Sequence, residues 1–174
     1  MNYYEIDSFN PLLETFAIPE EFVPIRRLKP EEVLSKEAIA KFNKLGLQLR
    51  EVQMFTTQPH KFTGIHIDSH DGRISKGAVN YVVGPGSMIW YKLKNDTTTK
   101  LETPAGTTYM LYEADNCEVI DELPLTKLTL VRTNVPHNIS NLTDEFRYCF
   151  SIRFEQNNFE ELFERLKSWN DSTN

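Results

Sequence analysis

The chain has 174 residues, of which 40% are hydrophobic, so it is long enough for one domain with a sizeable core. Its formal net charge of −6 disfavours a nucleic-acid binder, because such a protein needs a dense Lys/Arg surface. Its two cysteines lie far from any CxxC spacing, which argues against a disulfide scaffold or a zinc ribbon. The N-terminus lacks a signal-peptide pattern and no run approaches the length of a membrane span, so we expect a cytoplasmic protein without a membrane partner.

The first 46 residues are expected to support the rest of the chain. Residues 1–28 form a lead-in that ends in an extended run, where Pro24 is compatible only with an edge strand. Residues 30–46 are predicted to form one amphipathic helix, because Pro30 suits a first turn and Gly46 suits a helix end. We expect this helix to cover one side of a sheet.

From residue 47 onward the pattern changes to short β-type runs separated by turn residues such as Gly84-Pro85-Gly86. The predicted strands are 47–56, 62–68, 77–83, 87–93, 107–113, 117–121, 127–133, 136–140 and 146–155. A final amphipathic helix is predicted over 158–169, with Asn158 as its N-cap. This order predicts a single, mainly β domain over 1–174: a lead-in and helix (1–46), a jelly-roll or double-stranded β-helix core (47–155), and a C-terminal helix and tail (156–174).

The run Phe62–Asp68 places His66 and Asp68 two residues apart in a strand-like segment. Side chains at positions i and i+2 of a strand emerge on the same face, so this imidazole and this carboxylate are expected side by side. A non-haem iron site takes two of its three protein ligands from such a pair.

His137 is the candidate for a third ligand. His60 falls in an expected loop, and His70 falls where the Asp71-Gly72 turn is expected to begin. His137 lies instead on a late predicted strand, over 136–140. A lone histidine is more often structural, but its conjunction with the earlier His-x-Asp pair in this strand order favours a metal site.

The last predicted strand has an unusual second face. Its alternation places aromatic and aliphatic residues on one side and Arg147, Cys149, Ser151 and Arg153 on the other. On an ordinary edge strand the polar side would face water. The alternative is that it lines a cavity where the two guanidinium groups bind an anion such as a carboxylate.

The sequence His66-x-Asp68, followed by His137 and then by Arg147 ten residues later, resembles the iron(II)- and 2-oxoglutarate-dependent oxygenases. The resemblance covers about residues 47–155 and is closest to the prolyl-hydroxylase branch, where an Asp-Gly-Arg-like turn (here residues 71–73) follows the metal pair. It implies that His66, Asp68 and His137 bind Fe(II), with molecular oxygen and 2-oxoglutarate as co-substrates. It also implies that Arg147 pairs with the distal carboxylate of 2-oxoglutarate.

The resemblance implies three further contacts to the co-substrate. Asn80 stands where the branch has a tyrosine that holds the same carboxylate, which is a departure from the pattern. Ser151 would assist Arg147, and Arg153 would reach the other carboxylate or the substrate. The branch's Tyr-Pro-Gly segment is replaced here by the residues Phe55–Pro59.

The implied activity is hydroxylation of a peptidyl or small-molecule substrate, with release of succinate and carbon dioxide. Nucleic-acid demethylation is a weaker alternative because of the negative charge. Loops at 56–61, 69–76 and 94–106 are expected to select the substrate. Two other hypotheses stay open: the protein is a cupin-type metalloenzyme, or it is a metal-binding β-barrel with a degenerate site that acts as a binding module.

Overall fold

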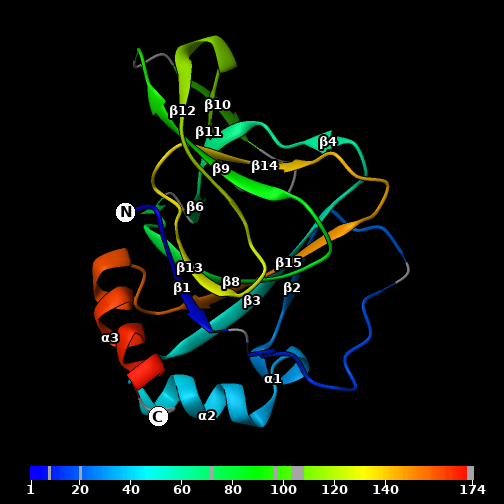
Figure 1. Cartoon of the computed structure of the whole chain (residues 1–174), viewed down its shortest axis with the longest axis vertical. Helices are drawn as coiled ribbons and strands as arrows, with labels where there is room; N and C mark the ends of the chain where they lie inside the picture. Colours follow the sequence, from blue (N-terminus) through cyan, green and yellow to red (C-terminus); the bar gives the residue numbers. More distant parts are fainter. Residues whose placement is uncertain (8, 20, 71–72, 96–97, 103–107, 172–174) are drawn as a thin grey trace.

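Two antiparallel sheets face each other and are flanked on one side by helices (Figure 1). This computed structural model describes residues 1–7, 9–19, 21–70, 73–95, 98–102 and 108–171. The first sheet has the strand order β1-β13-β8-β15-β3-β2. Its strands are β1 (Tyr3–Asp7), β2 (Ile25–Leu28), β3 (Leu49–Thr57), β8 (Gly77–Val83), β13 (Leu128–Arg132) and β15 (Arg147–Phe154).

The second sheet has the order β10-β11-β5-β14-β9-β12, and the short β4 also pairs with β14. Its strands are β4 (Lys61–Phe62), β5 (Ile65–Ile67), β9 (Ser87–Leu93), β10 (Thr98–Glu102), β11 (Thr108–Tyr112), β12 (Cys117–Pro124) and β14 (His137–Asn141). A small hairpin of β6 (Ser69–His70) and β7 (Arg73–Ile74) follows β5, and the 3-10 turn η1 (Ala114–Asn116) precedes β12. The fold is the predicted jelly-roll, cupin-like core with flanking helices.

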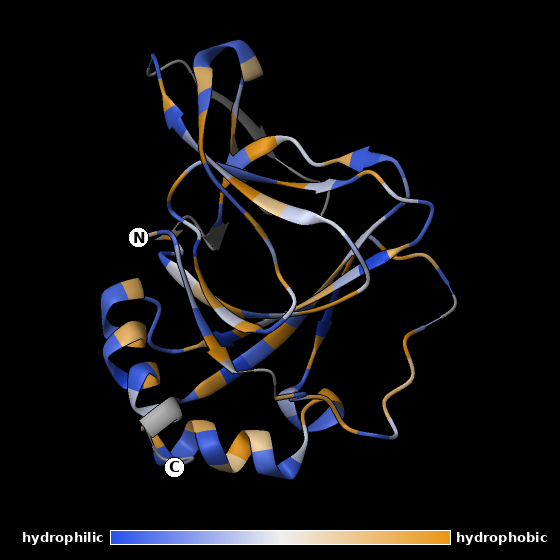
Figure 2. Cartoon of the chain, in the orientation of Figure 1, coloured by the Kyte–Doolittle hydropathy of each residue, from blue (hydrophilic) through white to orange (hydrophobic). Residues whose placement is uncertain are grey.

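Three helices cover the outer face of the first sheet: α1 (Pro30–Val33), α2 (Lys36–Lys44) and α3 (Phe159–Asp171) (Figure 1). Hydrophobic and hydrophilic residues alternate along α2 and α3, as amphipathic helices require (Figure 2). Their apolar sides meet Phe150, Ile152 and Phe154 of β15 in the larger hydrophobic core. Burying this face of β15 leaves the opposite face to line the space between the sheets.

A second core closes one side of the space between the sheets. It consists of Ala78, Met88, Trp90, Leu125 and Val131. Tyr3 of β1 stacks on Trp90 of β9, with ring centroids 5.7 Å apart. The side formed by β1, β13 and β8 is therefore packed against β9 and β12, and we call it the closed side.

The helix predicted over 30–46 is in fact two helices, so that prediction was wrong in part. Leu34 adopts an extended conformation (φ −92°, ψ 143°) and forms a bridge with Leu12 of the lead-in. Ser35 then caps α2, because its Oγ accepts a hydrogen bond from the Ala38 amide at 3.0 Å. A long-range contact thus interrupts a helical pattern that looked continuous.

Several strand boundaries also differ from the prediction. The predicted strand 62–68 is divided into β4 and β5, because Thr63 turns aside to bond Ile139 of β14 through both its amide and its hydroxyl. The strands β1 and β10 were missed, although the edge strand after Pro24 was predicted. The C-terminal helix and its Asn158 cap are confirmed, since Asn158 Oδ1 accepts a hydrogen bond from the Glu160 amide at 2.9 Å.

No helix within the described ranges is long and apolar enough to cross a membrane.

Candidate functional site

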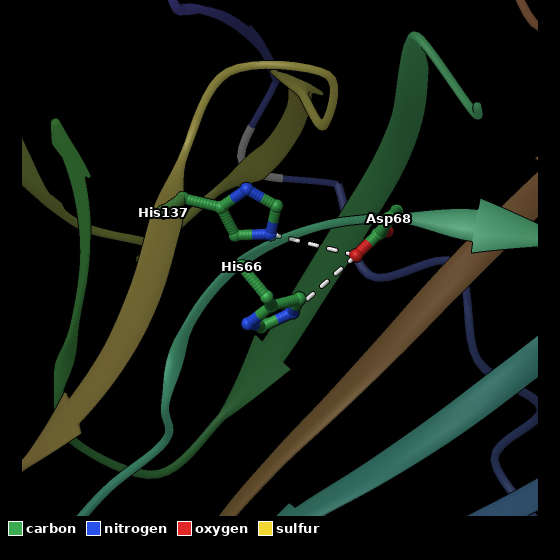
Figure 3. A group of neighbouring side chains, drawn as sticks. All are labelled: His66, Asp68 and His137. Atoms are coloured by element: carbon green, nitrogen blue, oxygen red, sulfur yellow. Dashed lines mark ion pairs between the residues drawn. The ribbon is translucent and has the colours of Figure 1, made fainter. Parts of the chain in front are cut away.

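His66, Asp68 and His137 converge on one point between the sheets (Figure 3). Their ligand atoms all lie within 4.8 Å of one another. The Nε2 atoms of both histidines lie 3.5 Å from Asp68 Oδ1. Two imidazoles and one carboxylate at this spacing form a cluster that could bind a metal ion.

Strand pairing explains how residues 71 positions apart in the chain meet. His66 of β5 is the direct cross-strand partner of His137 of β14, so the two rings lie side by side with centroids 4.6 Å apart. Asp68 follows β5 directly, and its amide donates a hydrogen bond to the Thr133 carbonyl at 3.0 Å. The Ser75 amide donates to the Asp68 carbonyl at 3.1 Å, which closes the base of the β6–β7 hairpin.

Both histidines have their Nδ1 atoms bonded to backbone carbonyls. His66 Nδ1 lies 2.7 Å from the Gly64 oxygen, and His137 Nδ1 lies 2.8 Å from the Val135 oxygen. A carbonyl only accepts, so Nδ1 carries the hydrogen in each ring. In the neutral form this leaves the lone pair on Nε2, directed toward Asp68, which is the tautomer that a metal ligand needs.

Arg153 forms the strongest contact of the Asp68 carboxylate. Its Nη2 donates to Asp68 Oδ2 at 2.8 Å, and its Nη1 donates to Ser75 Oγ at 3.2 Å. Burial alone would raise the pKa of Asp68, but the charge of Arg153 and, when their rings are protonated, hydrogen bonds from the two histidines hold that pKa well below its usual range. Asp68 is therefore an anion whose Oδ1 faces the histidines while Oδ2 is held by the guanidinium.

The pKa of His66 is raised above its ordinary value. Burial by itself lowers the pKa of this ring, but the hydrogen bond to Asp68 and the charge of that carboxylate outweigh the effect, with a smaller contribution from the Gly64 carbonyl. A proton and a metal ion compete for the same Nε2 lone pair. The Asp68 carboxylate that stabilises a proton bound there would also stabilise a bound metal ion.

A cavity of about 310 Å³ opens beside this cluster. The polar face of β15 forms one of its walls, so the prediction that this face lines a cavity is confirmed. The lining residues from β15 are Arg147, Cys149, Ser151 and Arg153. Burial raises the pKa of the Cys149 thiol, which is therefore neutral.

Arg147 is the most deeply buried charged side chain of the cavity wall, with 1% of its surface exposed. Its Nε and Nη2 atoms have no hydrogen-bond partner, and burial lowers the pKa of this guanidinium. Gly86 makes room for it: a Cβ there would lie 3.1 Å from Arg147 Cδ and 2.5 Å from the Ser140 oxygen, and its φ is +102°. The turn between β8 and β9 is thus shaped around the arginine side chain.

Asn80 and Ser151 lie directly opposite each other on β8 and β15, and both line the cavity. Asn80 Oδ1 and Ser151 Oγ are buried without a hydrogen-bond partner. Buried polar atoms in native proteins nearly always have partners, so these atoms and the free donors of Arg147 together indicate a polar ligand. The structure places all seven predicted site residues on one cavity.

Two residues that hold the site together were missed. The Thr133 hydroxyl donates to the Ser75 carbonyl at 2.8 Å, and Ser75 in turn accepts from Arg153. Serine and threonine are common in loops, and nothing in the sequence distinguished these two. His70 ends β6, and the turn predicted at Asp71-Gly72 lies outside the described residues.

No protein-family model matches the chain, and no similar sequence was found among curated proteins. Among solved structures, the chain is similar to the capsular polysaccharide assembling protein CapF from Staphylococcus aureus (19% identity, 60% of this chain, 24% of CapF, TM-score 0.33). The structure of CapF with the inhibitor 3-isopropenyl-tropolone gives 19% identity over 64% of this chain and 25% of that one, with a TM-score of 0.31. E. coli ycfD gives 15% identity over 74% of this chain and 31% of that one, with a TM-score of 0.40.

The chain therefore spans about a quarter to a third of the length of these proteins. At such identities and TM-scores the likeness carries no argument about function. The cupin-like fold rests on the sheet order itself, and the chain has a His-Asp-His cluster that could bind a metal ion.

Proposed function

We propose that the protein is an iron(II)- and 2-oxoglutarate-dependent oxygenase. The observation that carries this proposal is the buried Arg147 guanidinium, whose Nε and Nη2 lack partners on the wall of the cavity that holds the His-Asp-His cluster. A buried cation without a counter-ion is costly, so the site is built for an anion. The guanidinium presents a planar fork of N–H donors, which matches the two oxygen atoms of a carboxylate.

The donor set suits Fe(II). Two neutral imidazoles and one carboxylate on one side of a metal leave open coordination positions on the other, as in non-haem iron oxygenases. A 2-oxo acid has a carboxylate and a keto oxygen that can chelate such a metal, and 2-oxoglutarate has a second carboxylate for Arg147. Bound iron would supply the activation of oxygen, while the protein residues supply geometry and charge.

The proposed reaction uses one substrate, 2-oxoglutarate and oxygen. The C1–C2 bond of 2-oxoglutarate breaks and C1 leaves as carbon dioxide, while one oxygen atom enters the new carboxylate of succinate. The other oxygen atom is inserted into a substrate C–H bond to give an alcohol. The two electrons from the oxidative decarboxylation and the two from the C–H bond together reduce oxygen completely.

Arg153 has a positioning role in this proposal. Its bond to Asp68 Oδ2 leaves Oδ1 as the ligand atom and fixes the carboxylate plane. Residues that orient metal ligands in this way typically change metal affinity about 10–100-fold when removed. Its Nε has no partner, so a contact to the co-substrate or the substrate stays a prediction.

The test is thermal unfolding without oxygen, with Fe(II) alone, 2-oxoglutarate alone, and both together. A ligand at 100 times its dissociation constant stabilises a protein by about 2.7 kcal/mol, so binding is visible as a rise in Tm. We expect the two ligands together to stabilise the protein more than the sum of each alone. His66→Ala should abolish the shift due to metal, and Arg147→Met should abolish only the extra shift due to 2-oxoglutarate.

His60→Ala is the matched control, because this histidine is exposed and bonded to Asp144 away from the cavity. It should behave as the unmodified protein does. An equal shift for His66→Ala and the unmodified protein would contradict the proposal. A metal shift without any effect of 2-oxoglutarate would instead favour a metal-binding module.

A further inference from the structure

We place the mouth of the cavity on the side of the sandwich opposite the closed side, because the lining residue Ile25 is exposed there. β3 and β2 form that end of the first sheet, and β11 lies near the corresponding edge of the second. Phe55 of β3, Ile25 of β2 and Leu111 of β11 all line the cavity. Ile25 is 43% exposed, so this apolar group reaches from the cavity wall to the surface.

Leu111 is the residue of the apolar mouth that lies next to the metal cluster. It is the direct cross-strand partner of His66, and its Cδ2 would lie 3.2 Å from a Cβ built on Gly64. A ligand that enters between Ile25 and Leu111 therefore reaches the cluster on the His66 side.

Every charged side chain among the described lining residues already has a role in the proposed function. His66, Asp68 and His137 form the metal cluster, Arg147 faces the co-substrate, and Arg153 is paired with Asp68. The rest of the described lining is uncharged: Pro24, Ile25, Phe55, Thr56, Thr57, Thr63, Gly64, Asn80, Met88, Leu111, Thr133, Ile139, Cys149 and Ser151.

Two charged residues that follow on the strands of the mouth, Arg27 and Glu51, face each other, and Glu51 also lies 3.4 Å from Arg50. Glu51 lies 4.0 Å from Arg27 Nε and accepts a hydrogen bond from Gln53 at 2.8 Å, on the continuation of the same strands. In the described lining, a cationic substrate group would find only the Asp68 carboxylate, which is already paired with Arg153, and an anionic group would find only guanidinium groups that already serve the co-substrate and Asp68. The loss of hydration of a charged group would therefore be poorly compensated.

The cavity volume limits the size of the group that enters. Sites for drug-sized ligands have about 300–1,000 Å³, so about 310 Å³ is near the lower bound. The same space has to hold 2-oxoglutarate. What remains is suited to a group the size of one amino-acid side chain.

We propose that the substrate presents an uncharged, apolar group of side-chain size, which enters between Ile25 and Leu111 and is oxidised at an aliphatic C–H bond. This inference rests on the proposed function and names the substrate class of the same site. A small apolar molecule and an apolar side chain of a peptide share this chemistry.

The test uses three probes of nearly equal shape: the N-acetyl amides of leucine, asparagine and aspartate. Each is titrated by calorimetry, without oxygen, into protein loaded with Fe(II) and 2-oxoglutarate. We expect the leucine probe to bind at least about 10-fold more tightly than the aspartate probe, with the asparagine probe also weaker than leucine. Equal affinities, a preference for aspartate, or no binding of the leucine probe would overturn the inference.

A fourth probe, 3-methylbutanamide, has the leucine side chain without the peptide backbone. Affinity equal to that of the leucine probe would support a small-molecule substrate, and affinity found only with the leucine probe would support a peptide. Ile25→Asn should weaken the binding of the leucine probe about 10-fold. Val119→Asn is the matched control, because Val119 is 56% exposed on the edge strand β12 of the other sheet, and it should change nothing.

The metal-dependent stabilisation by 2-oxoglutarate is measured first on each variant. If it is missing in the unmodified protein, the proposed function fails. If it is present and the probes rank in another order, only the substrate class fails.

Discussion

The two sides of the sandwich use the same strands in different ways. On the closed side, Ala78, Val131 and Trp90 form an apolar cluster, and Trp90 is fully buried against Tyr3. Two positions along β8 from the buried Ala78, the inward side chain is Asn80, and the neighbouring β15 presents Arg147 and Ser151. The first side is a packed core and the second lines a cavity.

The contrast is visible in the buried polar atoms. Among the described residues, the buried side-chain nitrogen and oxygen atoms without a partner belong to five residues: Asn80, Asn134, Arg147, Ser151 and Arg153. All of these except Asn134 line the cavity. Polar groups that would destabilise a core are therefore concentrated where a ligand can satisfy them, which is the expected pattern of a functional site.

Trp90→Ala should have the largest effect on stability, because it removes a fully buried ring from the closed side and leaves a cavity. We expect a loss of about 3–5 kcal/mol in the free energy of unfolding, measured by urea denaturation. The Trp90 Nε1 bond to the Arg132 carbonyl, at 2.9 Å, is lost as well. A loss below about 1 kcal/mol would mean that the closed side is not a packed core.

Arg153→Met should destabilise the metal-free protein by about 3 kcal/mol. The change leaves the buried Asp68 anion without its counter-ion, and removing one partner of a buried pair typically costs 3–5 kcal/mol. Adding Fe(II) or Mn(II) should recover part of this loss, because the metal then compensates the carboxylate. If metal instead restores nothing, Asp68 is not a ligand.

Arg147→Met, unlike Arg153→Met, should not lower the free energy of unfolding of the metal-free protein. This guanidinium is buried with unpartnered donors, so an apolar side chain of similar length should leave the metal-free protein unchanged or stabilise it by up to about 3 kcal/mol. The same variant should lose the stabilisation by 2-oxoglutarate. A destabilisation like that of Trp90→Ala would show that Arg147 is structural, and the comparison between the two sides would fail.

Ser151→Ala should have the smallest effect, because the Ser151 hydroxyl has no protein partner to lose. We expect a change within about 0.5 kcal/mol of zero. Thr129→Val is the matched control: its buried hydroxyl donates to the Lys127 carbonyl at 2.9 Å, and its loss should cost about 1 kcal/mol. Equal losses for the two variants would mean that Ser151 has a structural bond in solution.

Features that depend on the local alternation of polar and apolar residues were predictable from the sequence. The strands over 77–83 and 87–93 have the predicted bounds, and the polar face of β15 followed from its period of two. The resemblance carried by His66, Asp68, His137 and Arg147 predicted that these residues lie together, and they line one cavity.

Contacts between distant segments were not predictable. The bond from Arg153 to Asp68 joins residues 85 positions apart, and the bridge that breaks the first helix depends on Leu12 in the lead-in. β1 was missed because its pattern is short and its partner β13 lies far along the chain. Local propensity contains no information about such pairings, which the packing of the whole fold decides.

The proposed function requires that the cavity binds a metal and a 2-oxo dicarboxylate together. The most direct measurement compares 2-oxoglutarate with glutarate, which has both carboxylates but no keto oxygen, by calorimetric titration without oxygen. We expect 2-oxoglutarate to bind the Fe(II)-loaded protein at least about 10-fold more tightly than glutarate does, equivalent to about 1.4 kcal/mol, and removal of the metal to abolish this difference. Equal affinities of the two acids for the Fe(II)-loaded protein would contradict the proposed function.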